Sequence, residues 1–209
     1  MSLLLSAGLI ALTGAEAGQG PAASKGEGLR EIAPDNIPEW LRKLRREVAD
    51  MEQTLFRFEE TRTSRISARE RVFEGVVERE GAERLILYYH KPDRVTITME
   101  EDEVSMQREG KRRRSRDIDP EHGRVLRACF ALNLSVLLEH AEVSAQGDLE
   151  AWTIRAEPDS LREIKSLTLS GEGSLLRTLE VDAGGGSRRR FSFEPVSVDA
   201  VAPQAGGAE

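Results

Sequence analysis

The sequence predicts an α+β protein, in which one long antiparallel β-sheet is combined with an N-terminal helix and a central pair of helices. Apolar residues alternate with polar ones through much of segments 55–106 and 152–196, which is the period of β-strands. Helical spacing is confined to segments 37–51 and 120–138. Strands and helices therefore do not alternate as they do in a parallel α/β fold.

The first predicted element is an amphipathic helix. Its apolar residues recur at helical spacing and are Ile37, Trp40, Leu41, Leu44, Val48 and Met51. We expect Asn36 to cap this helix, with Glu39 as its capping-box partner and Pro38 in the first turn. Because such a helix is marginal alone, it should lie against the rest of the domain.

The period changes to two after this helix. Phe56 and Phe58 alternate with charged residues, Gly81 marks a turn, and Pro92 separates two strands. The strands expected here begin at residue 55 and continue over 71–79, 84–90, 95–99 and 104–106. Several of them are apolar on both faces, so both faces of the sheet require cover. We expect helices on one face and something else on the other.

The central helical region follows these strands. Asp119 is expected to cap it, Pro120 to occupy its first position, and Asn133 to start a second, short helix. Segment 125–138 is the most apolar part of the chain after the N-terminal run. The remaining expected strands include residues 152–154, 167–169, 175–181 and 191–196, with 183–187 as the last hairpin loop.

Composition limits the classes of function. The chain has 209 residues, 39% of them hydrophobic and 5% aromatic, so we expect one domain packed mainly by aliphatic side chains. A net charge of −7 argues against nucleic-acid binding. The single cysteine excludes an internal disulfide and a Cys-rich zinc site.

Both ends of the chain are expected to lie outside the domain. Residues 1–17 are predicted to be a signal peptide, because their apolar run is too short to span a bilayer and Ala15-Glu16-Ala17 fits a cleavage site. No basic residue precedes the run, so the signal is atypical or the true start lies upstream. Residues 18–35 are expected to be a flexible linker and 197–209 a disordered tail. Residues 36–196 are expected to form the domain of an exported, soluble protein.

The sequence contains no pattern typical of catalysis or metal binding. His90, His122 and His140 have no second ligand at zinc-binding spacing. Cys129 lies on an apolar helical face, which favours a buried structural thiol over a nucleophile. We therefore expect no enzyme activity, no metal and no cofactor.

Two basic runs allow two interpretations: Lys111–Arg114 with Arg116, and Arg188–Arg190. They could bind phosphate, anionic lipid headgroups or an acidic partner. They could also be solvated flanks of hairpins that offset the acidic segment 100–103. The acidic balance of the chain favours the second interpretation.

The ordered set of elements resembles the outer-membrane lipoprotein carrier (LolA-like) family, in a divergent branch. The resemblance covers residues 37–196, and segment 125–140 matches the position of the central lid helices of the family. It rests on Phe56-Arg57-Phe58-Glu59-Glu60-Thr61-Arg62, Phe73-Glu74-Gly75-Val76-Val77, Leu87-Tyr88-Tyr89-His90-Lys91-Pro92-Asp93-Arg94-Val95 and Trp152-Thr153-Ile154-Arg155-Ala156-Glu157-Pro158.

This resemblance implies a half-open β-barrel whose concave face is closed by a helical lid over an apolar cavity for acyl chains. The cavity residues expected from inward alternation are Phe56, Phe58, Leu87, Tyr89, Val95, Ile97, Val104 and Met106. The lid residues expected are Leu126, Phe130, Leu134 and Leu138. The alternative for each of these side chains is a place in an ordinary core. The family latches its lid with an arginine before the strand-breaking proline, and the candidate here is Lys91, which lacks a planar multi-donor group.

The function implied is that of a monomeric periplasmic carrier. It would take an acylated lipoprotein, or another lipid, from an inner-membrane exporter to an outer-membrane acceptor. The alternative is a lipid-sensing regulatory protein of the cell envelope that uses the same half-barrel. A lipid hydrolase is not supported, because no nucleophile–base pair is evident.

Overall fold

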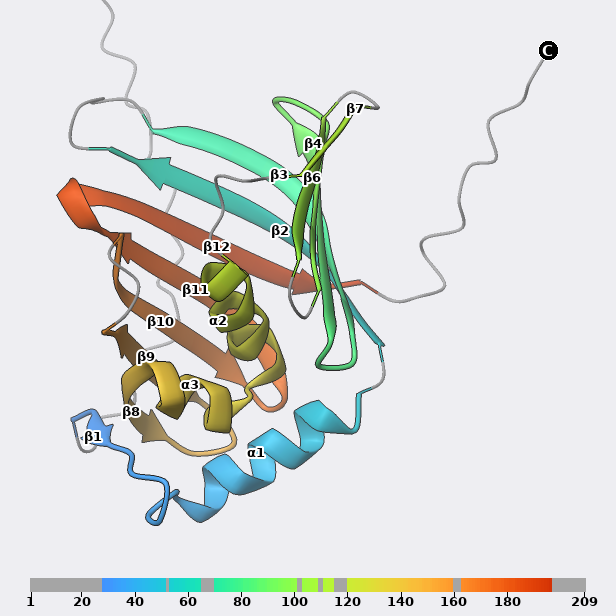
Figure 1. Cartoon of the computed structure of the whole chain (residues 1–209). Coiled ribbons are helices and arrows are strands. Elements are labelled where there is room, and N and C mark those ends of the chain that lie inside the picture. The colour runs from blue at the N-terminus through green and yellow to red at the C-terminus, as the bar shows by residue number, and fades with distance from the viewer. Residues whose placement is uncertain are drawn as a thin grey trace, which may run out of the picture.

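The structure is a computed structural model of the chain, and it describes residues 28–51, 53–64, 70–100, 103–108, 111–114, 120–159 and 163–196. The predicted signal peptide, residues 18–27 of the predicted linker, the proposed cap Asp119 and the predicted tail lie outside the described residues. Figure 1 shows the arrangement of the elements, which form a sheet with helices on one of its faces.

Twelve strands of the described chain form one antiparallel sheet. They are β1 (Arg30–Glu31), β2 (Gln53–Thr63), β3 (Arg71–Glu80), β4 (Arg84–Lys91), β5 (Val95–Met99), β6 (Val104–Arg108), β7 (Lys111–Arg114), β8 (Ala141–Gly147), β9 (Trp152–Pro158), β10 (Ile164–Glu172), β11 (Leu175–Ala183) and β12 (Ser187–Pro195). Their spatial order is β1-β8-β9-β10-β11-β12-β2-β3-β4-β5-β6-β7, so β1 and β7 are the two edges of an open sheet. The predicted α+β class with a curved antiparallel sheet is confirmed.

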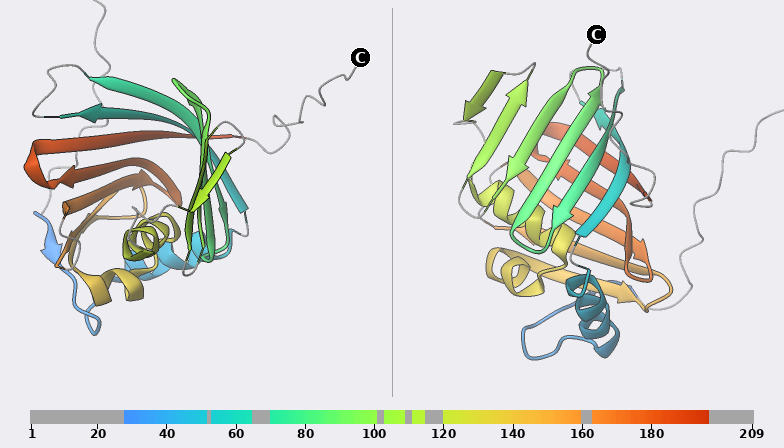
Figure 2. Two further views of the ribbon diagram at one scale, coloured as in Figure 1. Left: turned by 45° about the horizontal axis from the view of Figure 1, so that its top comes forward. Right: turned by 90° about the vertical axis from the view of Figure 1, so that its right-hand side faces the viewer.

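The sheet curves around the central helices. Figure 2 shows β4–β7 standing across from β9–β11, with α2 (Pro120–Ala131) between them on the concave side. The helices α1 (Glu39–Ala49) and α3 (Leu134–His140) lie beside α2 at the lower end in Figure 1. The helices therefore cover the concave face, as expected from strands that are apolar on both faces.

Helix α1 buries the stripe that its sequence predicts. Leu41 and Leu44 are fully buried and Val48 is nearly so. The predicted cap is wrong, because α1 has Pro38 at its N-cap position and no side chain caps it. The Asn36 amide instead donates to the Ala33 carbonyl at 3.0 Å, in a turn before the helix. Pro38 has an extended conformation and occupies the N-cap position, which lies two residues after Asn36.

The predicted start of α3 is confirmed, because the Asn133 side chain accepts a hydrogen bond from the Val136 amide at 3.4 Å. Strand β8 was not predicted. Its buried positions are the small residues Ala141, Val143 and Ala145, which give a weak alternation in the sequence. In the segment predicted to be a linker, β1 pairs with β8 and Ile32 is buried in the core.

Candidate functional site

The strand register places the eight predicted cavity residues on one face of the sheet. Residues directly opposite each other in an antiparallel pair share a face. One row of such partners runs across five strands and contains Phe56, Val77, Leu87, Ile97 and Met106. The next row contains Phe58, Gly75, Tyr89 and Val95. Val104 lies two residues from Met106 and therefore shares its face.

This face is closed by the helices. Phe130 of α2 makes an edge-to-face contact with Phe193 of β12, with ring centroids 5.4 Å apart. Of the predicted lid residues, Phe130 and Leu134 are buried, and Leu126 and Leu138 are partly buried against the core. Five of the predicted cavity residues are buried and Val95, Ile97 and Met106 are partly buried.

The six phenylalanines of the chain all belong to a network of ring contacts on this concave face. From the lid, the contacts run through Phe130, Phe193, Phe191, Phe58, Tyr89 and Phe73, with centroid separations of 5.1 to 6.2 Å. We call this series the aromatic path. Aromatic residues are only 5% of the sequence, so their concentration on one face defines the candidate site.

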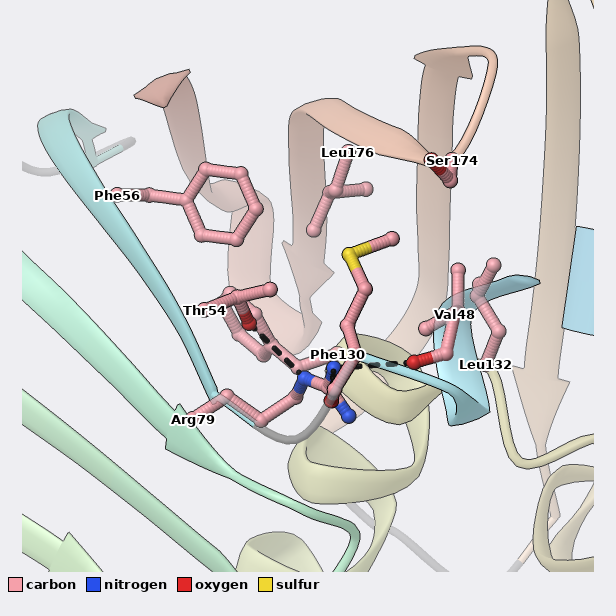
Figure 3. A pocket seen from close by; sticks show the side chains of 9 residues that line it. Val48, Thr54, Phe56, Arg79, Phe130, Leu132, Ser174 and Leu176 are labelled. Carbon is pink, nitrogen blue, oxygen red and sulfur yellow. Dashed lines mark hydrogen bonds between the residues drawn. The ribbon is translucent and has the colours of Figure 1, made fainter. Parts of the chain in front are cut away.

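The cavity described between the central helices and the sheet is small. A cavity of about 20 Å³ lies between the end of α1, the start of β2, the end of α2 and the β10–β11 turn. Its lining includes Phe56, Phe130 and Leu176, which Figure 3 shows around the opening. Pockets for small ligands usually measure about 300–1,000 Å³, whereas this one has room for about one water molecule. Phe130 and Leu132 therefore leave little free space in this part of the concave face.

Arg79 fixes one side of this cavity. Its guanidinium donates to the Thr54 hydroxyl at 3.0 Å and to the carbonyls of Val48, Met51 and Gly81 at 2.7 to 3.1 Å. Two of these bonds are drawn in Figure 3. Because Arg79 is only 4% exposed, desolvation lowers its pKa, and the four acceptors compensate the buried charge. Arg79 thereby ties the C-terminal end of α1 to the sheet.

The far end of the aromatic path is polar. The Glu60 carboxylate is fully buried and accepts hydrogen bonds from Arg62 at 2.6 and 2.7 Å and from the Tyr89 hydroxyl at 2.8 Å. Burial and the neighbouring Glu60 carboxylate raise the pKa of Tyr89, so its hydroxyl remains a donor. Although burial opposes its charge, the hydrogen bond and charge of Glu60 raise the pKa of Arg62.

The proposed latch residue Lys91 lies away from these contacts. Its ammonium forms an ion pair with Glu74 of the neighbouring strand at 2.9 Å, and its side chain is 68% exposed. A tie between lid and body is made by Arg127 of α2, which donates to the Glu83 carbonyl in the β3–β4 turn at 2.7 Å. Arg127 is 8% exposed, and beside it lies a mostly polar hollow of about 220 Å³.

Cys129 is fully buried on α2. Burial raises the pKa of its thiol to about 12, so the thiol is protonated at neutral pH. A protonated, enclosed thiol is a poor nucleophile, as the sequence interpretation expects. Within the described residues, no group of three or more His, Cys, Asp or Glu side chains gathers to hold a metal ion.

Comparison with known proteins identifies the family. A family model described as "Outer membrane lipoprotein carrier protein LolA-like" matches residues 36–206. The chain belongs to the LolA-like family. No curated protein matches it.

Three solved structures are similar to this chain at low sequence identity. A LolA superfamily protein from Nitrosomonas europaea has 9% identity and a TM-score of 0.41, over 75% of this chain and 92% of that one. A DUF1329 family protein from Desulfovibrio piger has 10% identity and a TM-score of 0.41, over 74% and 88%. The Mycobacterium tuberculosis lipoprotein LppX has 12% identity and a TM-score of 0.35, over 76% and 96%.

The helices of this LolA-like chain are short, and among the described residues none is long and apolar enough to cross a membrane. Sequence reasoning missed three polar residues of the concave side: Glu60, Arg79 and Arg127. One signal was available for the first of them. Glu60 and Arg62 continue the inward alternation of Phe56 and Phe58, which places an acid and a base on an apolar strand face.

Proposed function

We propose that this LolA-like protein is a periplasmic carrier, which binds the acyl chains of a lipoprotein or another lipid on its concave face and carries them toward the outer membrane. The observation that supports this most is the concentration of all six phenylalanines on the face that the lid helices cover. Rings and aliphatic side chains offer acyl chains an apolar surface without a requirement for hydrogen bonds.

Binding requires the lid to move. The closed cavity of about 20 Å³ cannot hold an acyl chain, so α2 must leave part of the concave face before a chain can replace it. Each buried CH₂ group contributes about 0.8 kcal/mol, so a chain of ordinary length can offset the loss of the contacts made by Phe130 and its neighbours. The proposed cavity residues then contact the acyl chain in place of the lid.

The first experiment asks whether the protein binds lipid. The full chain is purified from a bacterial periplasm, organic extracts are analysed by mass spectrometry, and a fluorescent fatty acid is titrated into the delipidated protein. We expect co-purified acyl lipids and saturable binding. Recovery of no lipid together with no fatty-acid binding would refute the proposal.

The second experiment locates the bound chain. A fatty acid with a photoreactive diazirine is cross-linked to the protein, and the modified peptides are mapped. We expect modification of β2 and β4 at concave residues such as Phe58 and Leu87. Equal modification of residues on the opposite face, for example Thr98, would place the lipid elsewhere.

A carrier and a lipid sensor differ in whether they move the cargo from one membrane to another. The assay mixes donor vesicles that hold an acylated lipoprotein with acceptor vesicles and follows movement of the cargo. A carrier accelerates transfer in proportion to its concentration, whereas a lipid sensor binds lipid without accelerating transfer. The proposed exporter and acceptor partners are then sought by cross-linking in cells, with the monomer as the expected cargo-bound state.

A further inference from the structure

Three arginines lie side by side at one end of the concave face. Arg189 of β12 is directly opposite Arg62 of β2, and Arg62 is directly opposite Arg71 of β3. Directly opposite residues share a face. The guanidinium of Arg62 lies 3.9 Å from the ring centroid of Phe73, which belongs to the aromatic path, so this face is the concave one. These strand ends lie at the left of the sheet in Figure 1.

Glu60 balances only part of this charge. Its carboxylate is fully buried, and both of its oxygens bind Arg62, while the Nε of Arg189 lies 4.0 Å away. The row remains accessible to solvent, because the side chains of Arg62 and Arg189 are 33% and 54% exposed and Arg71 is exposed. Like charges directly opposite each other destabilise a sheet, so this row is costly unless an anion joins it.

Arg62 is held in an orientation suited to an anion. Its Nε and Nη2 bind the two oxygens of Glu60, which fixes the plane of the guanidinium. Its planar group also stacks on Phe73. A guanidinium fixed in this way loses little conformational freedom when it binds phosphate, and arginine forks match the oxygens of phosphate closely.

The basic run 188–190 is divided by the strand between the two faces. Arg189 points to the concave side, whereas Arg190 points to the convex side and lies 3.5 Å from Glu180. Of the two interpretations of this run, the solvated hairpin flank fits Arg190, and the anion-binding interpretation fits Arg189.

We propose that Arg62, Arg71 and Arg189 bind the phosphate group of a phospholipid whose acyl chains lie along the aromatic path. The path begins under the lid at Phe130 and ends at Phe73, against which Arg62 stacks, so an apolar surface and a cationic end adjoin. This arrangement complements an anionic amphiphile. The inference rests on the proposed lipid-binding function and names the chemical class of the cargo.

The test compares two lipids with identical fluorescent acyl chains, phosphatidic acid and diacylglycerol, which differ in the phosphate. We expect the full chain to bind phosphatidic acid at least about tenfold more tightly, with a preference that decreases as NaCl is added. The double variant Arg71→Gln, Arg189→Gln should lose the preference and keep its affinity for diacylglycerol. Both side chains are exposed, so the fold is retained. Arg190→Gln, on the opposite face of the same strand, is the matched control and should keep the preference.

Three results would overturn this inference. The first is equal binding of the two lipids by the unsubstituted protein, which refutes the phosphate site and leaves lipid carriage intact. The second is a preference that persists in the double variant. The third is displacement of phosphatidic acid by an equal concentration of inorganic phosphate, which indicates a site for free anions. Failure of the protein to bind either lipid refutes the carrier function itself.

Discussion

Replacement of Arg127 by methionine should shift the lid toward its open state. Methionine keeps an unbranched apolar stem but cannot donate to the Glu83 carbonyl, a bond of 2.7 Å in the structure. A hydrogen bond from a charged group contributes about 1.5–3 kcal/mol. Because 1.4 kcal/mol corresponds to a factor of ten, the open population should increase by roughly 10- to 100-fold.

The assay measures the lid without and with ligand. Amide hydrogen exchange of α2 should accelerate by the same factor in Arg127→Met, because exchange reports local opening directly. Stopped-flow uptake of a fluorescent fatty acid should accelerate in parallel. The matched control is Lys91→Met, which tests the latch candidate proposed from the sequence. Its exposed pair with Glu74 contributes about 0–1 kcal/mol, so lid exchange should stay unchanged.

Two outcomes would refute this reasoning. If Arg127→Met leaves the exchange of α2 unchanged, the contact with the β3–β4 turn does not hold the lid. If Lys91→Met accelerates exchange more than Arg127→Met does, Lys91 is the latch, as the resemblance of the sequence to the family implies. Acceleration throughout the sheet would indicate global destabilisation and would also count against a local role.

Three further substitutions test the body of the domain. Gly75→Ala should destabilise the fold by about 1–3 kcal/mol in urea unfolding, because a methyl group there meets the Phe58 ring and a backbone carbonyl of β4; an unchanged unfolding midpoint would contradict this packing. Arg79→Met should cost about 2–4 kcal/mol by the same measurement, since it removes the donors to four acceptors, one of them in a buried hydrogen bond and three in part-buried ones; a loss below 1 kcal/mol would show that water replaces the donors. Burial raises the pKa of Cys129 from 9.0 to about 12. The stabilisation that the protonated thiol gives to the folded state is therefore complete below pH 9, and it decreases by about 1.4 kcal/mol per pH unit from there to about pH 12. The difference in unfolding free energy between the protein and Cys129→Ala should therefore shrink from pH 9 upward, and a constant difference would show that burial does not raise the pKa of this thiol.

The fold class could be predicted from the sequence because the strongest signals in the sequence are periodic. Phe56 and Phe58, then Leu87 and Tyr89, repeat every two residues on a face that the register confirms as common. Strand β8 could not be predicted, because the alanines at its inward positions differ little in hydrophobicity from their neighbours. The cap of α1 was misplaced because Asn36 and Glu39 have the right spacing, and only the conformation at Pro38 decides where the helix begins.

The polar half of the site could not be derived in the same way. Arg79 and Arg127 donate hydrogen bonds to backbone carbonyls of segments distant in sequence. Every residue has such a carbonyl, so the sequence does not show which one accepts the bond. The row of Arg62, Arg71 and Arg189 depends on the register of three strands, which alternation within one strand does not determine. In the sequence alone, Arg189 is indistinguishable from its neighbours in a basic run.

The kinds of contact also indicate which part of the domain can move. Helix α1 is joined to the sheet by the hydrogen bonds of Arg79 to carbonyls of Val48 and Met51, which an acyl chain cannot replace. Helix α2 meets the concave face largely through apolar side chains, among them Phe130 against Phe193. Apolar contacts are non-directional, so lipid methylenes can substitute for them at little cost. The exchange of lid for lipid is therefore expected at α2, while α1 remains with the sheet.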